Sequence, residues 1–248
     1  MPPARVTWLL VTAELEVEIW SDVVCPWCYL ATRRFARTLA QFPHRDRVAV
    51  RWRSYELDPH APARIDDLAG YLAAKYDITL EQAQDAYEEV TELAAGEGLE
   101  YRFDRAIGAN TFDAHRLIHL AAEHGRATEA EERLFAAHFT RGEAIGDRAT
   151  LVRLAGEIGL DPDEAARALD SDLYADQVRA DQAEAAELQI RGVPYFLLDR
   201  RFAISGAQPE QVFVDALQQA WDAGHPAATV TTLGAPDAPG CSDDACAI

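Results

Sequence analysis

The sequence is poor in cysteine and methionine and has no long apolar run. Only four of its 248 residues are cysteine, and they form two close pairs, Cys25/Cys28 and Cys241/Cys246. No cysteine is left to cross-link loops, which excludes a small secreted domain built on a disulfide framework. No apolar run approaches the roughly 20 residues that a membrane-spanning helix needs. We therefore expect no membrane partner.

Basic residues are also scarce. The chain has 23 Lys and Arg against 42 Asp and Glu, for a formal net charge of -19, and Lys75 is its single lysine. Such a charge repels a phosphate backbone, which argues against nucleic-acid binding. With 49% hydrophobic and 26% charged residues, the composition is that of a globular protein of one large domain or two modest ones.

The N-terminus only faintly resembles a signal peptide. Residues 6–13 are mostly apolar, but threonines interrupt them and no small-x-small cleavage site precedes Glu14. We expect residues 1–14 to be a disordered leader, or to reflect a start codon chosen too far upstream, and the protein to be cytoplasmic. In that compartment a CxxC pair is catalytic or metal-binding more often than structural.

The first cysteine pair stands where a predicted strand gives way to a predicted helix. Residues 15–20 alternate in polarity, and apolar residues recur at helical spacing in residues 29–42. Cys25 falls near the N-cap of that helix, where unpaired N–H groups and the helix dipole favour a thiolate. Pro26 suits the first helical turn because it has no N–H and its φ is already helical.

These positions predict a redox-active dithiol. Cys28, one turn further along, can attack a mixed disulfide formed at Cys25, so Cys25 is the expected nucleophile and Cys28 the resolving thiol. Trp27 between them supplies no imidazole to stabilise the thiolate. Two alternatives stay open: half of a zinc site, for which only Cys241/Cys246 could supply the second half, or an incidental pair.

The remaining pattern predicts an α/β fold. Residues 47–57 form a second strand, which completes a βαβ unit with the dithiol at the C-terminal end of its first strand. Residues 66–190 are helical throughout, as judged by apolar spacing. Residues 192–199 and 201–205 are two strands joined by a tight turn, hence antiparallel, and a helix starts at residues 208–210. This order, βαβ then ββα, is a thioredoxin-like fold with a large all-helical insertion.

We divide the chain accordingly. Residues 15–62 and 191–224 form the two parts of a thioredoxin-like domain, and residues 63–190 form a helical insertion domain. Residues 1–14 are the leader, and residues 225–248 are a flexible C-terminal tail rich in Pro, Ala, Thr and Gly that carries a CxxxxC pair.

Pro194 heads the predicted third strand. Because it faces a CxxC in this topology, we expect a cis bond between Val193 and Pro194, although cis is rare for X–Pro bonds in general. The Val193 backbone would then lie beside Cys25, free to pair with an extended substrate chain without selecting its side chains.

Other polar residues are weaker candidates. His115 and His119 are one helical turn apart, but no third metal ligand is in sight, so we expect no metal site. His115 and Asn110 are expected to line a groove between insertion and dithiol. Asp22 and Glu56 are candidates for a buried carboxylate that takes a proton from Cys28, with solvated carboxylates as the alternative.

The CPWC turn, the helical insertion, the Gly-Val-Pro segment and the final ββα unit resemble the DsbA-like thioredoxin-fold proteins. Residues 54–59 (SYELDP) and 110–117 (NTFDAHRL) are similar to further motifs of the FrnE-type subgroup, over about residues 16–224. The resemblance implies a thiol–disulfide oxidoreductase or isomerase that needs no metal or organic cofactor. Its partners would be protein or small-molecule thiols and disulfides.

Two functional alternatives remain. The 2-hydroxychromene-2-carboxylate isomerases resemble the same frame, but they are glutathione-linked and carry a serine where Cys25 stands. A zinc-binding module would use all four cysteines. The resemblance also extends to a C-terminal CxxxxC, which suggests that Cys241 and Cys246 relay disulfides to the CPWC pair, with a static disulfide or a shared metal site as alternatives.

Overall fold

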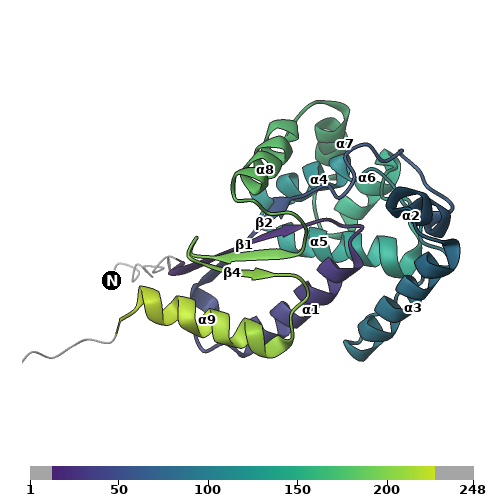
Figure 1. Cartoon of the computed structure of the whole chain (residues 1–248). Coiled ribbons are helices and arrows are strands. Elements are labelled where there is room, and N and C mark those ends of the chain that lie inside the picture. Colours follow the sequence, from purple (N-terminus) through teal and green to yellow (C-terminus); the bar gives the residue numbers. More distant parts are fainter. Residues whose placement is uncertain (1–12, 227–248) are drawn as a thin grey trace, which may run out of the picture.

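A computed structural model describes residues 13–226 of the chain, and four strands form the sheet at its centre (Figure 1). The strands are β1 (Leu15–Ser21), β2 (Val48–Ser54), β3 (Tyr195–Leu198) and β4 (Phe202–Ser205). Their order in the sheet is β2-β1-β3-β4. β1 pairs in parallel with β2 and antiparallel with β3, and β3 pairs antiparallel with β4. The βαβ–ββα order predicted from the sequence is therefore confirmed.

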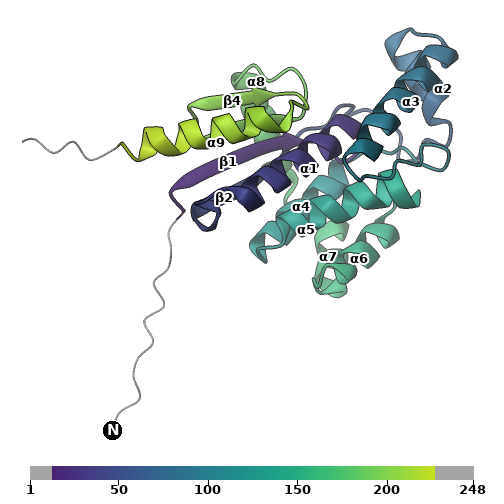
Figure 2. The ribbon, with the colours of Figure 1, turned by 90° about the horizontal axis from the view of Figure 1, so that it is seen from below.

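Two helices cover one face of this sheet. α1 (Pro26–Gln41) and α9 (Glu210–Gly224) lie side by side across it (Figure 2). Val17 and Ile19 of β1 pack there against Phe35 of α1 and Phe213 of α9, all buried. This apolar layer explains why every second residue of β1 is aliphatic.

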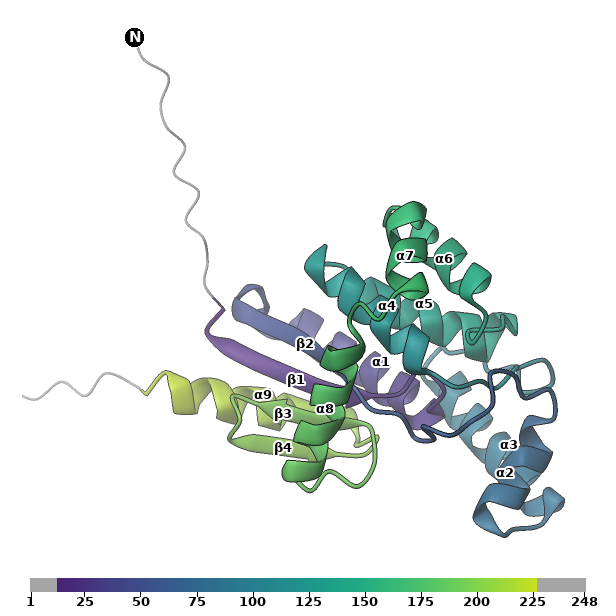
Figure 3. The ribbon, with the colours of Figure 1, turned by 90° about the horizontal axis from the view of Figure 1, so that it is seen from above.

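The other face of the sheet carries α8 (Ala175–Glu187), which crosses it (Figure 3). Because both faces are covered, Glu18 and Trp20 of β1 are buried as well. The Trp20 indole N–H donates to the Asp181 carbonyl at 3.1 Å. The alternating residues of β1 therefore pack against different helices on the two faces of the sheet. Neither set faces solvent.

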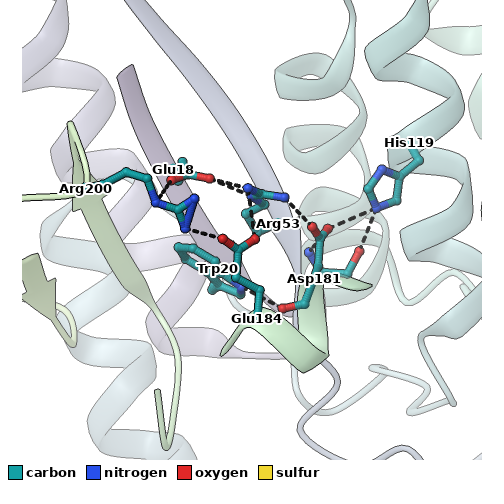
Figure 4. Close-up of polar contacts among 8 residues, drawn as sticks. Glu18, Trp20, Arg53, His119, Asp181, Glu184 and Arg200 are labelled. Carbon is teal, nitrogen blue, oxygen red and sulfur yellow. Dashed lines mark hydrogen bonds and ion pairs between the residues drawn. The ribbon is translucent and has the colours of Figure 1, made fainter. Parts of the chain in front are cut away.

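A buried charge network joins α8 to the sheet (Figure 4). The Arg53 guanidinium of β2 donates to a Glu18 carboxylate oxygen at 2.8 Å and to an Asp181 oxygen at 2.7 Å. The second Asp181 oxygen accepts the Ser54 backbone N–H at 2.9 Å and lies 3.1 Å from His119 Nε2. Buried carboxylates of this kind are tolerated because each has a charged or N–H partner.

The segment between β2 and β3 is helical. It contains α2 (Leu68–Tyr76), α3 (Leu80–Gly96), α4 (Phe112–Glu123), α5 (Ala127–Phe135), α6 (Arg148–Glu157), α7 (Pro162–Asp170) and α8. α4 to α7 share one apolar core of Leu, Ile and Ala side chains. α2 and α3 form a hairpin that lies apart from that bundle (Figure 3). Among the helices of residues 13–226, none is both long and apolar enough to cross a membrane.

Two details differ from the sequence expectation. The helix marked by Leu134 and Phe139 changes at Ala136–Arg141 into a π-helical segment, η2. β3 begins at Tyr195 and not at Gly192, and the preceding Pro194 has no N–H to donate to the ladder.

The predicted domain boundaries stay a prediction. Most of the predicted leader and tail, including Cys241 and Cys246, lies outside the described residues. At the edges of the described range, the Glu14 N–H donates to the Arg47 carbonyl and His225 Nε2 lies 2.6 Å from a Glu14 carboxylate oxygen.

Arg53→Ala should lower the free energy of unfolding by about 3–5 kcal/mol, because it leaves the Glu18 and Asp181 carboxylates buried without their cation. Urea unfolding followed by circular dichroism measures this. Arg179→Ala is the matched control, since its pair with Asp176 is exposed and should change stability by less than about 1 kcal/mol. Equal effects of the two variants would show that the buried network does not hold α8 on the sheet.

Candidate active site

The turn from β1 to α1 places the first cysteine at the start of a helix. Cys25 is the N-cap of α1, with an extended backbone (φ -88°, ψ 112°), and Pro26 is the first helical residue. The Cys25 N–H donates to the Asp22 carbonyl at 2.9 Å, which closes the turn. Both cysteines are free thiols. The helix therefore directs its positive end at the Cys25 sulfur, the position that favours a thiolate.

The peptide bond between Val193 and Pro194 is cis, as predicted, and lies against this turn. The Cys25 thiol is 3.7 Å from the Val193 carbonyl oxygen, to which it donates. Two segments 168 residues apart in the chain thus meet at one sulfur.

The residues of the CPWC turn differ in solvent exposure. Cys28 is fully buried and Cys25 is 3% exposed, whereas Trp27 is 40% exposed. Burial raises the pKa of the Cys28 thiol well above its usual value, and the neighbouring Cys25 raises it further. The Ser21 hydroxyl and the Asp22 backbone N–H act in the opposite direction. Cys28 therefore stays protonated at neutral pH and must lose a proton before it can attack a disulfide.

Aromatic side chains from the helical insertion contact the first turn of α1. The Tyr101 hydroxyl donates to the Pro26 carbonyl at 2.7 Å. Tyr29 stacks on Phe135, with ring centroids 4.8 Å apart. These contacts fix the first turn of α1 by packing, so the position of Cys25 does not depend on the strand alone.

Four polar side chains are buried around the end of β1. They are Ser21 at the end of β1, Asp22, His115 of α4 and Glu131 of α5. One side-chain atom of each has no hydrogen-bond partner within the described residues. His115 Nε2 lies 3.5 Å from Asp22 Oδ1, close enough for a charge interaction but outside hydrogen-bonding geometry.

Two of these groups are strongly perturbed. Burial raises the pKa of Glu131 from its usual 4.5 to about 7, although Ser21 and His115 oppose this. Burial alone would lower the pKa of His115, but the Asp22 carboxylate outweighs it and the net pKa is raised. Glu131 is thus a buried carboxyl that titrates near neutral pH.

A cavity of about 380 Å³ opens beside Cys25, between the CPWC turn and the α2–α3 hairpin. Its walls are mainly apolar and include Leu68, Leu72, Tyr87, Val90 and Phe103 as well as the exposed Trp27. Such a volume suits a small molecule or a large side chain.

Polar groups at the cavity are few. Asp58 accepts the Tyr71 hydroxyl at 2.6 Å and the Lys75 ammonium at 2.9 Å, and these two bonds lower the pKa of Asp58. His138 also lines the cavity, but burial lowers its pKa to about 4, so it is neutral at pH 7 and bonds the Ile107 carbonyl. Two further carboxylates, Asp22 and Glu89, also line the cavity.

The structure places the other predicted residues elsewhere. His115 and Asn110 are not among the residues that line the cavity. Asn110 Nδ2 donates to Glu56 Oε1 at 3.3 Å and to the Pro59 carbonyl at 3.1 Å, and the other Glu56 oxygen accepts Gln182. Glu56 is thus engaged in joining the loop after β2 to α8, whereas Asp22 borders both the cavity and the dithiol.

His119 Nε2 lies 3.1 Å from an Asp181 carboxylate oxygen (Figure 4) and 3.1 Å from the Ser54 hydroxyl oxygen, whereas His115 Nε2 faces Asp22. Within residues 13–226, no group of three or more His, Cys, Asp or Glu side chains could hold a metal ion. Cys241 and Cys246, which the zinc alternative requires, lie outside that range.

Comparison with known proteins places this arrangement in a family. The family described as DSBA-like thioredoxin domain matches residues 16–218, which is most of the chain. The chain belongs to the DSBA-like thioredoxin domain family. A crystal structure of a probable DsbA oxidoreductase from Streptomyces coelicolor is 44% identical, with a TM-score of 0.79, and the match covers 94% of this chain and 99% of that one.

More distant solved structures share the DSBA-like fold. A 2-hydroxychromene-2-carboxylate isomerase is 16% identical with a TM-score of 0.65, over 86% of this chain and 100% of that one. The cytosolic disulfide reductase DsbM from Pseudomonas aeruginosa is 17% identical with a TM-score of 0.60, over 82% of this chain and 98% of that one. DsbM has also been solved with glutathione. The narrower FrnE-type assignment stays a prediction.

Three residues of this DSBA-like site were not predicted from the sequence. Ser21 and Glu131 belong to the buried polar group, and His138 borders the cavity. Glu131 sits between Ala130 and Glu132 in a run of acidic residues typical of a solvated helix. One signal could have found it: Glu131 is spaced i, i+3, i+4 with Leu134 and Phe135, which places it on the buried stripe of α5.

Glu131→Gln should raise the free energy of unfolding at pH 8 by on the order of 3 kcal/mol, because ionising this buried carboxyl costs about 1.4 kcal/mol for each pKa unit above its unfolded value. The folded pKa of about 7 exceeds 4.5, so wild-type stability is lost as pH rises from 4.5 through 7. At pH 4 the two proteins should be equally stable. Urea unfolding at both pH values measures this, with the exposed Glu129→Gln as control; equal stability at pH 8 would contradict a raised pKa.

Proposed function

We propose that this member of the DSBA-like family is a thiol–disulfide oxidoreductase or isomerase that uses Cys25 and Cys28. The observation that carries the proposal is the position of the Cys25 thiol, at the N-terminus of α1 and 3.7 Å from the Val193 carbonyl. A helix N-terminus stabilises the thiolate, and the thiolate is the nucleophile in disulfide exchange.

The reaction follows in two exchanges. The Cys25 thiolate attacks one sulfur of the substrate disulfide, forms a mixed disulfide and releases the first substrate thiolate. Cys28 then loses its proton and attacks Cys25 Sγ, which forms the Cys25–Cys28 disulfide and releases the second substrate thiolate. The substrate is reduced by two electrons and the dithiol is oxidised. In the opposite direction, the same steps oxidise a substrate dithiol.

The positions of the residues around Cys25 suggest their roles in this reaction. The Val193 backbone next to Pro194 is positioned to pair with the chain that carries the substrate sulfur. Pro26 starts the helix, and Trp27, the exposed member of the turn, covers one side of the approach to Cys25. Protein disulfides and small-molecule thiols are both proposed partners in the cytoplasm, with no metal or organic cofactor. DsbM with bound glutathione favours glutathione as one such thiol.

The cavity favours a second candidate, a glutathione-linked isomerase that acts on a small molecule. Its apolar walls and its volume of about 380 Å³ would suit an aromatic substrate, and the isomerase among the structural neighbours shares the fold. The two cysteines argue for disulfide exchange, because an isomerase that only binds glutathione has no need of a resolving thiol at Cys28.

Turnover of insulin disulfides with dithiothreitol tests the first proposal. We expect wild type to accelerate precipitation of the insulin B chain, Cys25→Ser to lose this activity, and Cys28→Ser to accumulate mixed disulfides, because the first exchange can still occur. Mass spectrometry under non-reducing conditions detects the trapped species. A folded wild type without activity, together with glutathione-dependent isomerisation of an aromatic substrate, would favour the second candidate.

A relay through Cys241 and Cys246 stays a prediction, since both lie outside the described residues. Truncation after Gly240 should slow turnover with a protein reductant if the tail passes disulfides to Cys25 and Cys28. Unchanged turnover of the truncated protein would exclude the relay.

A further inference from the structure

A second cavity, of about 420 Å³, has no part in the proposed disulfide exchange. It lies between the edge strand β2, the C-terminal half of α4, the start of α5 and the first half of α8. It shares no lining residue with the cavity beside Cys25. A volume of this size suits a small molecule, and the side chains that line it indicate the chemical class of that molecule.

Two near-parallel aromatic rings belong to this lining. The imidazole of His119 and the phenol ring of Tyr174 are parallel to within 11°, and their centroids are 6.5 Å apart. That distance is near the outer limit of direct contact between two rings, so the ring faces stay available to a third ring. An aromatic ligand that enters the cavity can stack on them, and such stacking is a strong source of affinity for planar ligands.

Hydrogen bonds hold the aromatic walls of the second cavity in place. The His119 ring is fixed through Nε2, which lies 3.1 Å from an Asp181 carboxylate oxygen (Figure 4) and 3.1 Å from the Ser54 hydroxyl oxygen. Trp52, a third aromatic residue of the lining, donates its indole N–H to Thr128 Oγ1 at 2.9 Å. The walls are therefore preorganised, which lowers the entropic cost of binding a ligand.

Tyr174 has a backbone conformation that is unusual for its size. It is the N-cap of α8, with φ 65° and ψ 0°, in the left-handed region that favours glycine and costs a bulky residue free energy. Such costs persist where the surrounding structure fixes a residue, and they are concentrated at binding sites. Glycine or asparagine would adopt this conformation at a lower cost. A tyrosine at this position therefore indicates a use for its ring, which packs against the core of α4 to α7 and lines the cavity.

Two charged side chains of the lining are available to a ligand. Arg53 and Asp181 also line the cavity but bond each other at 2.7 Å. Arg51 and Glu123 are exposed, and neither forms an ion pair within residues 13–226. Arg51 lies two residues before Arg53, on the same face of β2, and Glu123 follows His119 by four residues, on the same face of α4. The lining thus offers one cation and one anion beside the aromatic rings.

We propose that the second cavity binds a small aromatic zwitterion, of which the aromatic α-amino acids are the simplest members. The ring of the ligand stacks on Tyr174 and His119. Its carboxylate binds the Arg51 guanidinium, and its ammonium group binds the Glu123 carboxylate. Each ligand charge then has a partner of opposite sign, which offsets the loss of its hydration. The site contains neither cysteine of the CPWC turn, so it is independent of the proposed disulfide exchange.

Isothermal titration calorimetry of the full chain with the free amino acid L-tryptophan tests this site. Three analogues each remove one feature of the probe. Tryptamine lacks the carboxylate, indole-3-propionate lacks the ammonium group, and cyclohexylalanine keeps both charges but has no aromatic ring. We expect cyclohexylalanine to bind about 10-fold more weakly than tryptophan, as for the loss of an aromatic stack. The two indole analogues should each bind about threefold more weakly, as for the loss of an exposed ion pair.

Four variants locate the probe. Tyr174→Leu keeps an apolar side chain against the helical bundle but removes the stacking ring, and it should weaken tryptophan binding by about 10-fold. Tyr76→Leu, the matched control at the cavity beside Cys25, should leave that binding unchanged. Arg51→Gln should remove the preference for tryptophan over tryptamine, and Glu123→Gln the preference over indole-3-propionate. Both of these changes are at exposed positions, so the two variants should fold as wild type does.

Tryptophan that fails to bind saturably, or that binds no better than cyclohexylalanine, would overturn the proposal. Binding that is lost in Tyr76→Leu but kept in Tyr174→Leu would place the probe beside Cys25 and would overturn it equally. If Tyr174→Leu does not fold, wild-type selectivity among the analogues in both Arg51→Gln and Glu123→Gln is the contradicting result. Insulin turnover decides the proposed disulfide exchange separately, whichever way tryptophan binds.

Discussion

Asp22 holds the active site to the sheet. Its backbone carbonyl accepts the Cys25 N–H, and its buried carboxylate accepts the Leu57 N–H that follows β2. One residue, through its carbonyl and its side chain, therefore ties the CPWC turn to the ends of two neighbouring strands. The direction of α1, the position of Cys25 at its N-cap and the distance to Val193 all depend on this turn. Parallel strands end at the same edge of a sheet, which makes such a tie possible.

The helical insertion is as much a part of the site as the thioredoxin-like frame. The Tyr101 hydroxyl bonds the first turn of α1, and Tyr87 and Val90 of α3 line the cavity. Its attachment to the frame is electrostatic as well as apolar, through Arg53 and Asp181 on the opposite face of the sheet. The insertion adds much of the cavity lining to a frame that by itself offers two thiols and a backbone edge.

Much of this arrangement could be predicted from the sequence, because local chemistry dictates it. The strand before Cys25, the proline after it and the short turn at Asp199 each have few alternatives. The pairing of Val193 with Cys25 also followed, once the order of elements indicated the fold. The buried polar group could not be predicted in the same way. Whether His115, Asn110 or Glu131 faces a cavity, a neighbour or another charge depends on how helices from distant segments pack.

Lys75 is the single lysine of the chain, and it borders the cavity beside the dithiol while it bonds Asp58. The only side-chain amine of this protein is therefore next to the place where a substrate would enter. With the α-amino group blocked, an amine-selective fluorophore attached there would report occupancy of the cavity without a change of sequence. Any enzyme that acylates lysine side chains has one position to modify in this chain, and that modification would leave the Asp58 carboxylate bonded to the Tyr71 hydroxyl without its cation.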